Sequence, residues 1–530
     1  MTHTTASRTD VCIVGAGPAG ALLADTLAAA GHDVVVLEAG PRFDPEDRIT
    51  QMERSIRPGD SDHSVWEMGG PRDAYTSSGE NFYPLNHARV KGVGGSTLHW
   101  QGMVMRLHES DFAATGPDGG EWPIDYDELR PYYASAEKEL GVAGSVDNPF
   151  APPRDEPYPM PAFAPSHSDS IFAEACEALE ITTHSVGNAR NSEAYDGRSQ
   201  CVGYGTCNPV CPSGAKYSAD TTIEKAEAKG VRVIAEAPVQ RLETTASGER
   251  VEAAVYAKNG RTYRQEARQF ILAAGGVEIP RLLLLSASDD HSDGLANSSG
   301  AVGRYFMEHL FAGMGGVLPG RETRQNHIGF NTTESHQFYD TDDPDIGPIK
   351  LEFLNYAGPS PVEMAMDAAE YGDELLETLQ DSYGHELGIG ALVGQAPRKE
   401  NYIGLDTAKT DDHGNPVPDV HWRVGERERR TLARANEIQR AVMDELGVDI
   451  RWTVGPENTG PTYHHMGTTR MGTNPETSVV DARLRTHDVA NLTIASSSVF
   501  VTAGAMNPTL TIAALAFRAA DFVDESLKQA

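Results

Sequence analysis

Cysteine is scarce in this sequence, and long apolar runs are absent from it. Five cysteines in 530 residues exclude a disulfide-stabilised scaffold. No apolar run reaches the roughly 18 residues that a membrane-spanning helix needs, so we expect no direct insertion into a membrane. Residues 1–10 are polar and lack the apolar core of a secretory signal. These shortages together predict a cytoplasmic protein.

Basic residues are also few, and lysine is the rarer of the two. The sequence has 44 Lys and Arg against 77 Asp and Glu, a formal net charge of −33. Such a surface repels the phosphates of nucleic acids, so we expect no nucleic-acid partner. The acidic side chains also repel one another, and concentrated salt screens that repulsion. The charge therefore favours a halophilic, salt-adapted protein, with an ordinary acidic protein as the alternative.

A strand–helix–strand unit opens the chain. Val11–Val14 is an apolar run typical of a buried strand, Ala19–Ala30 is rich in Ala and Leu, and Asp33–Leu37 is a second apolar run. Units of this kind build parallel α/β sheets. The sequence therefore predicts a Rossmann-like α/β fold.

The turn between the first strand and the helix carries a dinucleotide-binding pattern. It reads GAGPAG over residues 15–20, and its glycines, Gly15, Gly17 and Gly20, let the backbone approach a pyrophosphate at the helix N-terminus. Glu38 ends the second strand, where a carboxylate can accept hydrogen bonds from the ribose hydroxyls of an adenine nucleotide. Together these features predict binding of an adenine dinucleotide.

Further elements follow along the chain. Residues 41–88 are polar and predicted to be loops, and residues 117–165 are rich in Pro and aromatic residues and predicted to be irregular. The remaining predicted elements are helices over Thr221–Gly230, Ile279–Leu285 (with Pro280 in its first turn), Glu426–Leu446 and Pro508–Val523, and strands over Val231–Ala235, Val239–Thr244, Val251–Tyr256, Phe270–Gly276 and Leu492–Ile494.

Two polar motifs stand near the C-terminal end. YHHMGTTRMG over residues 463–472 places His464 and His465 on a Gly-rich turn, and AMNPT over residues 505–509 places Asn507 at the start of a helix. Neutral histidine suits the acceptance of a proton near neutral pH. An Asn amide can both donate and accept a hydrogen bond. The pair suggests a proton acceptor and a second polar group that meet above a cofactor.

The ordered motifs resemble those of the glucose–methanol–choline (GMC) flavoprotein oxidoreductases over nearly the whole chain. Besides GAGPAG and the two C-terminal motifs, they are GVGGSTLHW at 92–100, CPSGAKYS at 211–218, AAGGVEIPRLLL at 273–284 and VGRYFMEH at 302–309. Within the family the chain is most similar to the flavin subunits of bacterial gluconate, fructose and glucose dehydrogenases. The resemblance implies an α/β fold, with a Rossmann-like FAD-binding domain and a discontinuous α+β substrate domain on an antiparallel sheet.

The resemblance also implies that the domains alternate along the chain. The FAD-binding domain would comprise residues 1–150, 211–314 and 456–530, the substrate-binding domain residues 315–455, and residues 151–210 an irregular excursion. Residues expected to bind FAD are Gly15, Gly17, Pro18, Ala19, Gly20, Glu38, Gly94, Gly95, Ser96, His99, Val239, Ala274, Gly275, Ser496, Asn507 and Pro508. Ser496 stands where many relatives have Asp, and its hydroxyl can still hydrogen-bond a flavin phosphate or ribityl group.

By the same resemblance, His464 takes the family's position of the catalytic base. His465 stays a candidate; adjacent side chains on an extended turn point opposite ways, so only one should face the flavin, and we expect the other to be a hydrogen-bonded structural histidine. Asn507 takes the position of the second polar group, which orients the substrate hydroxyl, although Asn before Pro is also a common helix cap. The helix that begins at Pro508 would point N–H groups at the flavin's pyrimidine end.

His99 and three cysteines raise two further questions. Some relatives attach FAD covalently through a histidine at this place; the alternative for His99 is packing against the flavin without a bond. Cys201, Cys207 and Cys211 have the spacing of the ligands of a 3Fe-4S cluster in multisubunit relatives, although other members carry inert cysteines here. Zinc would need a fourth ligand. Cys12 and Cys176 are isolated and expected to be buried apolar residues.

The resemblance implies an FAD-dependent dehydrogenase that oxidises a CH–OH group of a sugar, sugar acid or polyol. Electrons would leave through the cluster to a cytochrome or quinone, with a small partner subunit that could carry the export signal. The alternatives are an oxidase that reduces O2 to H2O2 and a non-catalytic flavin electron-transfer subunit. Residues that could line the substrate pocket, or simply pack, are Trp100, Gln101, Phe353 and Tyr356.

Overall fold

The apolar run at the start of the chain lies in the middle of the largest sheet. Strand β2 (Thr9–Val14) pairs in parallel with β3 (Val34–Leu37) on one side and with β11 (Arg261–Leu272) on the other. All four residues of β3 are buried, as expected for a parallel strand covered on both faces. The structure, a computed structural model, describes residues 4–57, 62–116, 118–323, 329–354 and 361–529.

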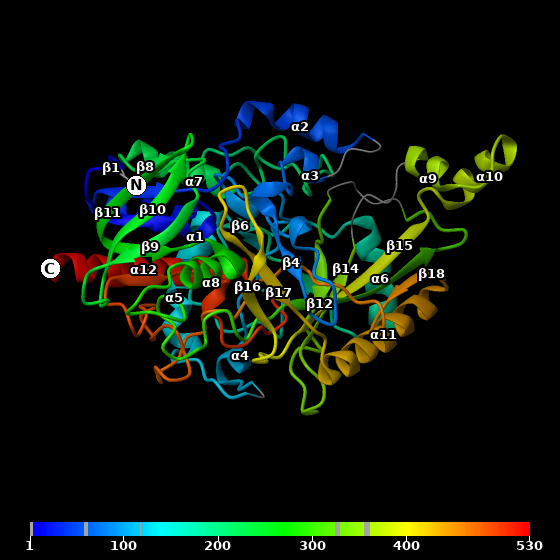
Figure 1. The fold of residues 1–530 in the computed structure, drawn as a ribbon. Helices are drawn as coiled ribbons and strands as arrows, with labels where there is room; N and C mark the ends of the chain where they lie inside the picture. Colours follow the sequence, from blue (N-terminus) through cyan, green and yellow to red (C-terminus); the bar gives the residue numbers. More distant parts are fainter. Residues whose placement is uncertain (1–3, 58–61, 117, 324–328, 355–360, 530) are drawn as a thin grey trace.

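This first sheet is mixed, because its parallel core continues into an antiparallel meander. Strand β11 is long enough to pair with the parallel strands at one end and with β10 at the other. Among the described residues, its strands are β1 (Thr4–Thr5), β2, β3, β8 (Arg232–Ile234), β9 (Val239–Thr244), β10 (Val251–Lys258), β11 and β19 (Leu492–Ile494). Both ends of the chain lie at this side of the molecule (Figure 1).

Helices from distant parts of the chain pack on this sheet. Helix α1 (Pro18–Ala29) contacts both α7 (Ala219–Ala228) and α12 (Thr509–Gln529), and α12 contacts α5 (Tyr126–Leu140). The buried side of α1 is made of Ala, Leu and Gly, which permits close packing. The N-terminal and C-terminal parts of the chain therefore share one core.

Helix α8 begins earlier than the sequence predicted. It spans Gly275–Leu285, so Pro280 lies inside the helix and not in its first turn. A proline has no N–H to donate to the carbonyl four residues before it. The carbonyl of Gly276 accepts a hydrogen bond from the hydroxyl of Thr468 instead (2.7 Å), which supplies the missing donor.

The second sheet is antiparallel and lies at the opposite end of the molecule (Figure 1). Its strands, in spatial order, are β18 (Asp449–Val454), β12 (His309–Val317), β15 (Glu386–Gly394), β14 (Ile349–Phe353), β13 (Thr333–Ser335) and β7 (His184–Ser185). Helix α11 (Glu426–Leu446) packs on β12, β14 and β15, and α6 (His167–Ala178) packs on α11 and β14. The expected fold class, a Rossmann-like domain combined with an antiparallel sheet, is confirmed.

The remaining strands and helices of the described residues are smaller. They are the strands β4 (Thr76–Ser77), β5 (Ala143–Gly144), β6 (Met160–Pro161), β16 (Tyr402–Thr410) and β17 (Pro416–His421), and the helices α2 (Arg48–Ser55), α3 (Asp62–Val65), α4 (Glu109–Ala113), α9 (Pro361–Asp367) and α10 (Asp373–Ser382). Strands β16, β17 and β4 form one small sheet, and β5 and β6 form another.

Three segments that were expected to be loops or irregular contain helices. Helix α2 lies within 41–88, α5 within 117–165, and α6 within 151–210. A capping box starts α5, in which Asp125 and Glu128 each accept the other's backbone N–H. That short signal was present in the sequence, but the many Pro and aromatic residues around it outweighed it.

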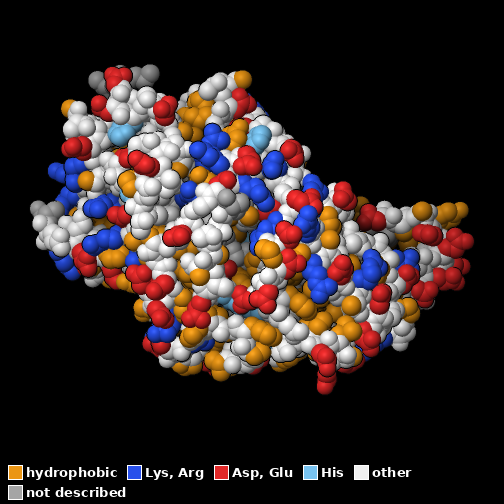
Figure 2. Space-filling view, turned by 90° about the horizontal axis from the view of Figure 1, so that it is seen from below, with side chains coloured by type: hydrophobic (Ala, Val, Ile, Leu, Met, Phe, Trp, Pro, Cys, Tyr) orange, Lys and Arg blue, Asp and Glu red, His pale blue; other side chains and the backbone are white. Residues whose placement is uncertain are grey.

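Acidic side chains are spread over the face shown in Figure 2 and gather at the end formed by α9 and α10. Residues 361–383, which contain these two helices, include no Lys or Arg. Among the described residues, no helix combines the length and apolarity that crossing a membrane requires. The expected salt adaptation stays a prediction.

Candidate functional site

A cavity of about 1070 Å³ lies between the two sheets. One side, which we call the glycine wall, is formed by Gly15, Gly17 and Gly95 together with Glu38. The opposite side, the strand wall, is formed by Phe311 of β12, Glu352 of β14 and Leu392 of β15. The volume exceeds that of an ordinary small-ligand pocket and suits a dinucleotide with a second molecule beside it.

The glycine wall is made of backbone. The Cα atom of Gly17 would lie only 2.8 Å from a Cβ placed on Gly95, whose φ of +56° is itself in the left-handed region. The N–H of Gly94 donates to the carbonyl of Ala16 (2.9 Å). These contacts bring two glycine turns, 78 residues apart in sequence, side by side at the N-terminus of α1, where N–H groups favour phosphate.

Glu38 is buried against the same turn. Its carboxylate accepts hydrogen bonds from the N–H of Ala16 (2.8 Å) and the N–H of Gly40 (2.9 Å). Burial raises the pKa of Glu38, and the two N–H groups oppose that rise. Each carboxylate oxygen keeps a further lone pair, so Glu38 can still accept hydrogen bonds from ribose hydroxyls, as the sequence predicted.

Most of the residues expected to bind the cofactor line this cavity, and two do not. The lining includes Gly15, Gly17, Pro18, Ala19, Glu38, Gly95, Ser96, His99, Val239, Ala274, Gly275, Ser496, Asn507 and Pro508. Gly20 instead faces the protein, because a Cβ there would lie 1.9 Å from the carbonyl oxygen of Gly15. A Cβ on Gly94 would meet the side chain of Leu98 at 2.9 Å. Both glycines permit close packing behind the wall.

His464 lies in the cavity wall with its hydrogen-bond pattern fixed by a second histidine. His309 donates from Nε2 to the carbonyl of Ala503 (3.0 Å), so its Nδ1 is an acceptor. Nδ1 of His464 lies 2.9 Å from that acceptor and must carry the proton. Nε2 of His464 makes no hydrogen bond to any described residue and keeps its lone pair. The geometry thus presents a neutral imidazole nitrogen that can accept a proton.

The charge state of His464 agrees with this tautomer. Burial lowers the pKa of His464 well below its usual range, and the neighbouring His309 and Lys350 lower it further. Burial likewise lowers the pKa of His309 to about 4. Both rings are therefore neutral at neutral pH, and His464 is available as a base.

His465 also lines the cavity, and the expectation that only one of the pair faces the flavin stays a prediction. Its ring packs on Tyr83, with the ring centres 5.7 Å apart. Its Nε2 is buried without a hydrogen-bond partner among the described residues and lies 3.9 Å from Glu308. The expected hydrogen-bonded structural histidine is therefore not found. No second histidine in the described part of the chain fixes the tautomer of His465 in the way that His309 fixes the tautomer of His464.

Asn507 lines the cavity beside the start of α12 and contacts a buried lysine. Nζ of Lys350, on β14, donates to Oδ1 of Asn507 (2.7 Å). The lysine is 0% exposed and also lies 2.6 Å from Oε1 of Glu352. The second polar group that the sequence predicted is thus attached to a buried ion pair of the strand wall.

Comparison with known proteins identifies the family. The GMC oxidoreductase sequence models match residues 76–311 and 397–516, and an FAD-binding-domain model matches residues 8–54. The chain is 34% identical to the fructose dehydrogenase large subunit of Gluconobacter japonicus, and the aligned region covers 98% of each chain. It belongs to the GMC oxidoreductase family.

A second relative agrees with that assignment, and a solved structure has the same fold. The 2-methyl-1,2-propanediol dehydrogenase of Mycolicibacterium austroafricanum is 31% identical over 98% of this chain and 96% of that protein. The crystal structure of pyridoxine 4-oxidase from Mesorbium loti has a TM-score of 0.65 at 19% identity, covering 97% of this chain and 98% of the other. This GMC oxidoreductase is an FAD-dependent oxidoreductase.

Three residues of this GMC oxidoreductase that the sequence did not predict, Glu308, His309 and Lys350, contact His464 or Asn507. Glu308 accepts the backbone N–H groups of His309 (3.1 Å) and His464 (2.8 Å), and burial raises its pKa to about 8. His309 fixes the tautomer of His464, and Lys350 contacts Asn507. A signal existed for each: MEH at 307–309 is part of a family motif, and Lys350 and Glu352 alternate with apolar residues in the strand sequence IKLEF.

The expected substrate-lining residues divide into two groups. Trp100 and Gln101 line the cavity of the GMC oxidoreductase. Phe353 does not: it is fully buried and stacks on Phe172, with ring centres 4.7 Å apart. Tyr356 lies outside the described residues. Cys12 and Cys176 are buried among apolar residues, as predicted.

The cysteine loop reaches the same cavity. Cys207 is buried, Cys201 and Cys211 are half-buried, and Asn208 lines the cavity directly. Nζ of Lys216 donates to the carbonyls of Cys207 (2.7 Å), Trp100 (2.5 Å) and Leu98 (3.2 Å). This one ammonium group therefore joins the cysteine loop to the segment that carries His99.

Proposed function

We propose that this GMC oxidoreductase is a dehydrogenase that oxidises a CH–OH group of a sugar, sugar acid or polyol and passes the electrons to an external acceptor. The observation that carries the proposal is the tautomer of His464, whose free Nε2 shares the cavity with Asn507. The names of the two relatives that are more than 30% identical, a fructose dehydrogenase and a diol dehydrogenase, support the substrate class.

The residues present can carry out the proton steps of such an oxidation. Bound FAD supplies the acceptor for the hydride that leaves the carbinol carbon. Nε2 of His464 accepts the hydroxyl proton, and Asn507 holds the hydroxyl oxygen in place. Pro508 and Thr509, at the start of α12, line the cavity, and the N-terminus of a helix stabilises negative charge nearby.

A pair of histidine variants tests the assignment of the base. We expect His464→Ala to reduce flavin reduction by substrate about 100- to 10,000-fold, the usual contribution of a general base, in a chain that still binds FAD. The matched variant His465→Ala should lose much less. Anaerobic stopped-flow absorbance, with a panel of ketoses, aldoses, sugar acids and diols, measures both. Unchanged flavin reduction in His464→Ala would overturn the proposal.

We propose further that Cys201, Cys207 and Cys211 hold a 3Fe-4S cluster that takes electrons from the flavin. Burial alone would raise the pKa of Cys211, but the N–H and ammonium of Lys216 outweigh it, and the pKa is lowered; burial raises the pKa of Cys201. Among the described residues these thiols do not form a group with all ligand atoms within 4.8 Å, which argues against a single ion and is compatible with one thiolate per iron.

Electron paramagnetic resonance of the purified holoprotein tests the cluster. We expect a signal from the oxidised protein that disappears on reduction by dithionite, and its loss in Cys207→Ser with the flavin retained. An accompanying small subunit and a cytochrome or quinone acceptor are part of this proposal. No signal in protein with full flavin content, together with stoichiometric H2O2 in air, would instead identify an oxidase.

A further inference from the structure

Lys350 stands at the centre of a buried charged network that the oxidation described so far does not use. Its ammonium lies 2.6 Å from Oε1 of Glu352 and 3.6 Å from Oε2 of Glu334, and it donates to Oδ1 of Asn507 at 2.7 Å. Lys350 and Glu334 are 0% and 1% exposed at their side chains. Burying a charge costs free energy unless it is paired, so such a network needs a reason.

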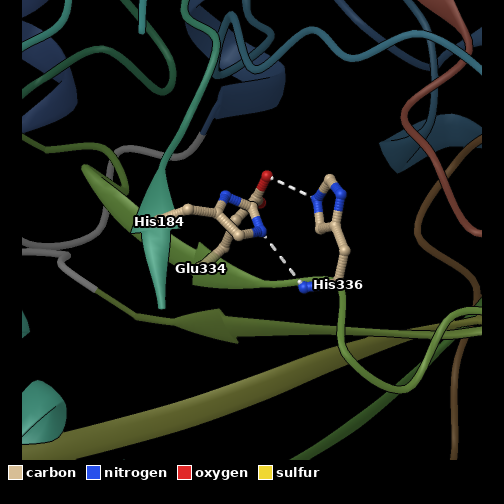
Figure 3. A group of neighbouring side chains, drawn as sticks. All are labelled: His184, Glu334 and His336. Atoms are coloured by element: carbon tan, nitrogen blue, oxygen red, sulfur yellow. Dashed lines mark hydrogen bonds and ion pairs between the residues drawn. The ribbon is translucent and has the colours of Figure 1, made fainter. Parts of the chain in front are cut away.

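The far side of the network is a histidine cluster that fixes Glu334 (Figure 3). Nε2 of His336 lies 2.8 Å from Oε1 of Glu334, and the backbone N–H of His336 donates to Nε2 of His184 (3.2 Å). Nδ1 of His184 donates to the carbonyl of Ser185 (3.0 Å), and Nδ1 of His336 accepts from the amide of Asn148 (3.0 Å).

Two histidines and a glutamate with ligand atoms this close could suggest a metal site. The hydrogen bonds argue otherwise, because both nitrogens of His184 and of His336 already have partners. The ammonium of Lys350, 3.6 Å from the remaining oxygen of Glu334, would also repel a cation. The cluster therefore serves as a rigid support that holds Glu334 against Lys350.

The chemistry of the ammonium decides how Asn507 is oriented. A lysine ammonium has three donors and no acceptor, so the atom of Asn507 that faces it must be Oδ1. Nδ2 then points away from Lys350, and it makes no hydrogen bond to any described residue. Asn507 lines the cavity. Its amide therefore offers the cavity the donor Nδ2, while Oδ1 is directed toward the ammonium of Lys350.

We propose that Lys350 is a positioning residue, which fixes the amide of Asn507 so that Nδ2 donates to the substrate oxygen while Nε2 of His464 accepts that oxygen's proton. The inference rests on the proposed function. A donor at Asn507 and an acceptor at His464 admit one orientation of a hydroxyl group, with its hydrogen toward His464. The substrate class this favours has a free hydroxyl on the carbon that is oxidised, and an ether or ester oxygen at that carbon would offer His464 nothing.

The test compares flavin reduction in four proteins: wild type, Asn507→Ala, Lys350→Met and the double variant. We expect Lys350→Met to lower the rate constant about 10- to 100-fold, the factor expected when a hydrogen bond to a charged group is lost. The substrate concentration at half-saturation should change much less. In the Asn507→Ala background, Lys350→Met should have no further effect. Wild-type reduction in Lys350→Met, or losses that multiply in the double variant, would overturn the proposal.

Two additional variants keep the test independent of folding. Leu351→Ala, on the opposite face of β14, should lower the melting temperature without slowing flavin reduction, which controls for damage to the strand. Asn507→Asp keeps the shape and can pair with Lys350, but it places an oxygen where the donor stood. We expect it to be at least as slow as Asn507→Ala. If it reduces flavin at the wild-type rate, Nδ2 is not the group that faces the substrate.

The outcomes separate this inference from the proposed function. If His464→Ala keeps its activity, the assignment of the base is wrong, whatever Lys350 does. If His464→Ala is inactive and Lys350→Met is not impaired, the oxidation stands and the role of Lys350 is wrong.

Discussion

The two sides of the cavity are built from different materials. The glycine wall is made of backbone N–H groups, close glycine turns and one carboxylate held by N–H groups. The strand wall and the residues behind it consist of buried charged and polar side chains that hold one another, such as Lys350 with Glu352 and His309 with His464. Backbone can bind the constant phosphates of a cofactor, whereas side chains can be exchanged to suit a substrate.

This difference also separates the effects of substitution. A change in the glycine wall alters the space available to the cofactor or the backbone itself. A change behind the strand wall leaves a buried charge or an imidazole without its partner. The first should affect flavin content or folding, and the second should affect the rate and pH dependence of flavin reduction.

The largest effect should come from adding one methyl group at Gly20. Its Cβ would lie 1.9 Å from the backbone oxygen of Gly15, so the turn has to shift, and we expect Gly20→Ala to cost about 3 kcal/mol or more. Gly17→Ala is the contrasting variant, because its Cβ would come no closer than 4.0 Å to a protein atom. It should fold and bind little FAD. Melting temperature and flavin absorbance distinguish the two variants. If both variants lost the same stability and the same amount of FAD, Gly17 and Gly20 would not have the separate roles described here.

The next effect should follow removal of the residue that fixes the tautomer. His309→Phe keeps a ring in place but offers no acceptor to Nδ1 of His464. The proton can then reside on Nε2, so we expect flavin reduction to slow about tenfold or more, in line with the loss of one oriented hydrogen bond. FAD content should stay unchanged. A wild-type rate would show that Thr462, whose hydroxyl lies 3.0 Å from the same Nδ1, is sufficient.

A smaller effect concerns the pH dependence of flavin reduction. The pKa of His464 lies well below 6.5 because of burial and the neighbouring His309 and Lys350. The rate should therefore be constant around neutral pH and fall only in more acidic solution. Lys350 is one of the groups that lower this pKa, so Lys350→Met should move the acid limb to higher pH. Stopped-flow rates across the pH range measure this shift. If the acid limb of the rate lies at the same pH in Lys350→Met as in the wild type, the charge of Lys350 does not lower the pKa of His464.

A last effect should appear in the pH dependence of stability. Burial raises the pKa of Glu308 from 4.5 to about 8, so the folded protein binds this proton more tightly than the unfolded chain does. The resulting stability is fully present below about pH 4.5 and is lost as the pH rises to about 8. We expect Glu308→Gln to flatten the fall in melting temperature over this interval. Identical slopes in the two proteins would show that Glu308 keeps its charge.

The glycine wall could be predicted from sequence, whereas the support behind the strand wall could not. GAGPAG, the following helix and Glu38 lie within 24 consecutive residues, so local pattern suffices. Lys350 and Asn507 are separated by 157 positions and His309 and His464 by 155, and no short motif joins either pair. His464 and Asn507 were found because each stands in a motif of its own. The tautomer and the amide orientation depend on partners that only the fold supplies.

The order in which the chain is synthesised has a consequence for its chemistry. The glycine turn is synthesised before α12, which packs on α1, and before β19, which pairs with β11. His464 and Asn507 belong to that same late segment. A nascent chain therefore cannot close the cavity around a flavin before it also contains the proton acceptor, so an incomplete chain does not expose a half-built redox centre to the cell.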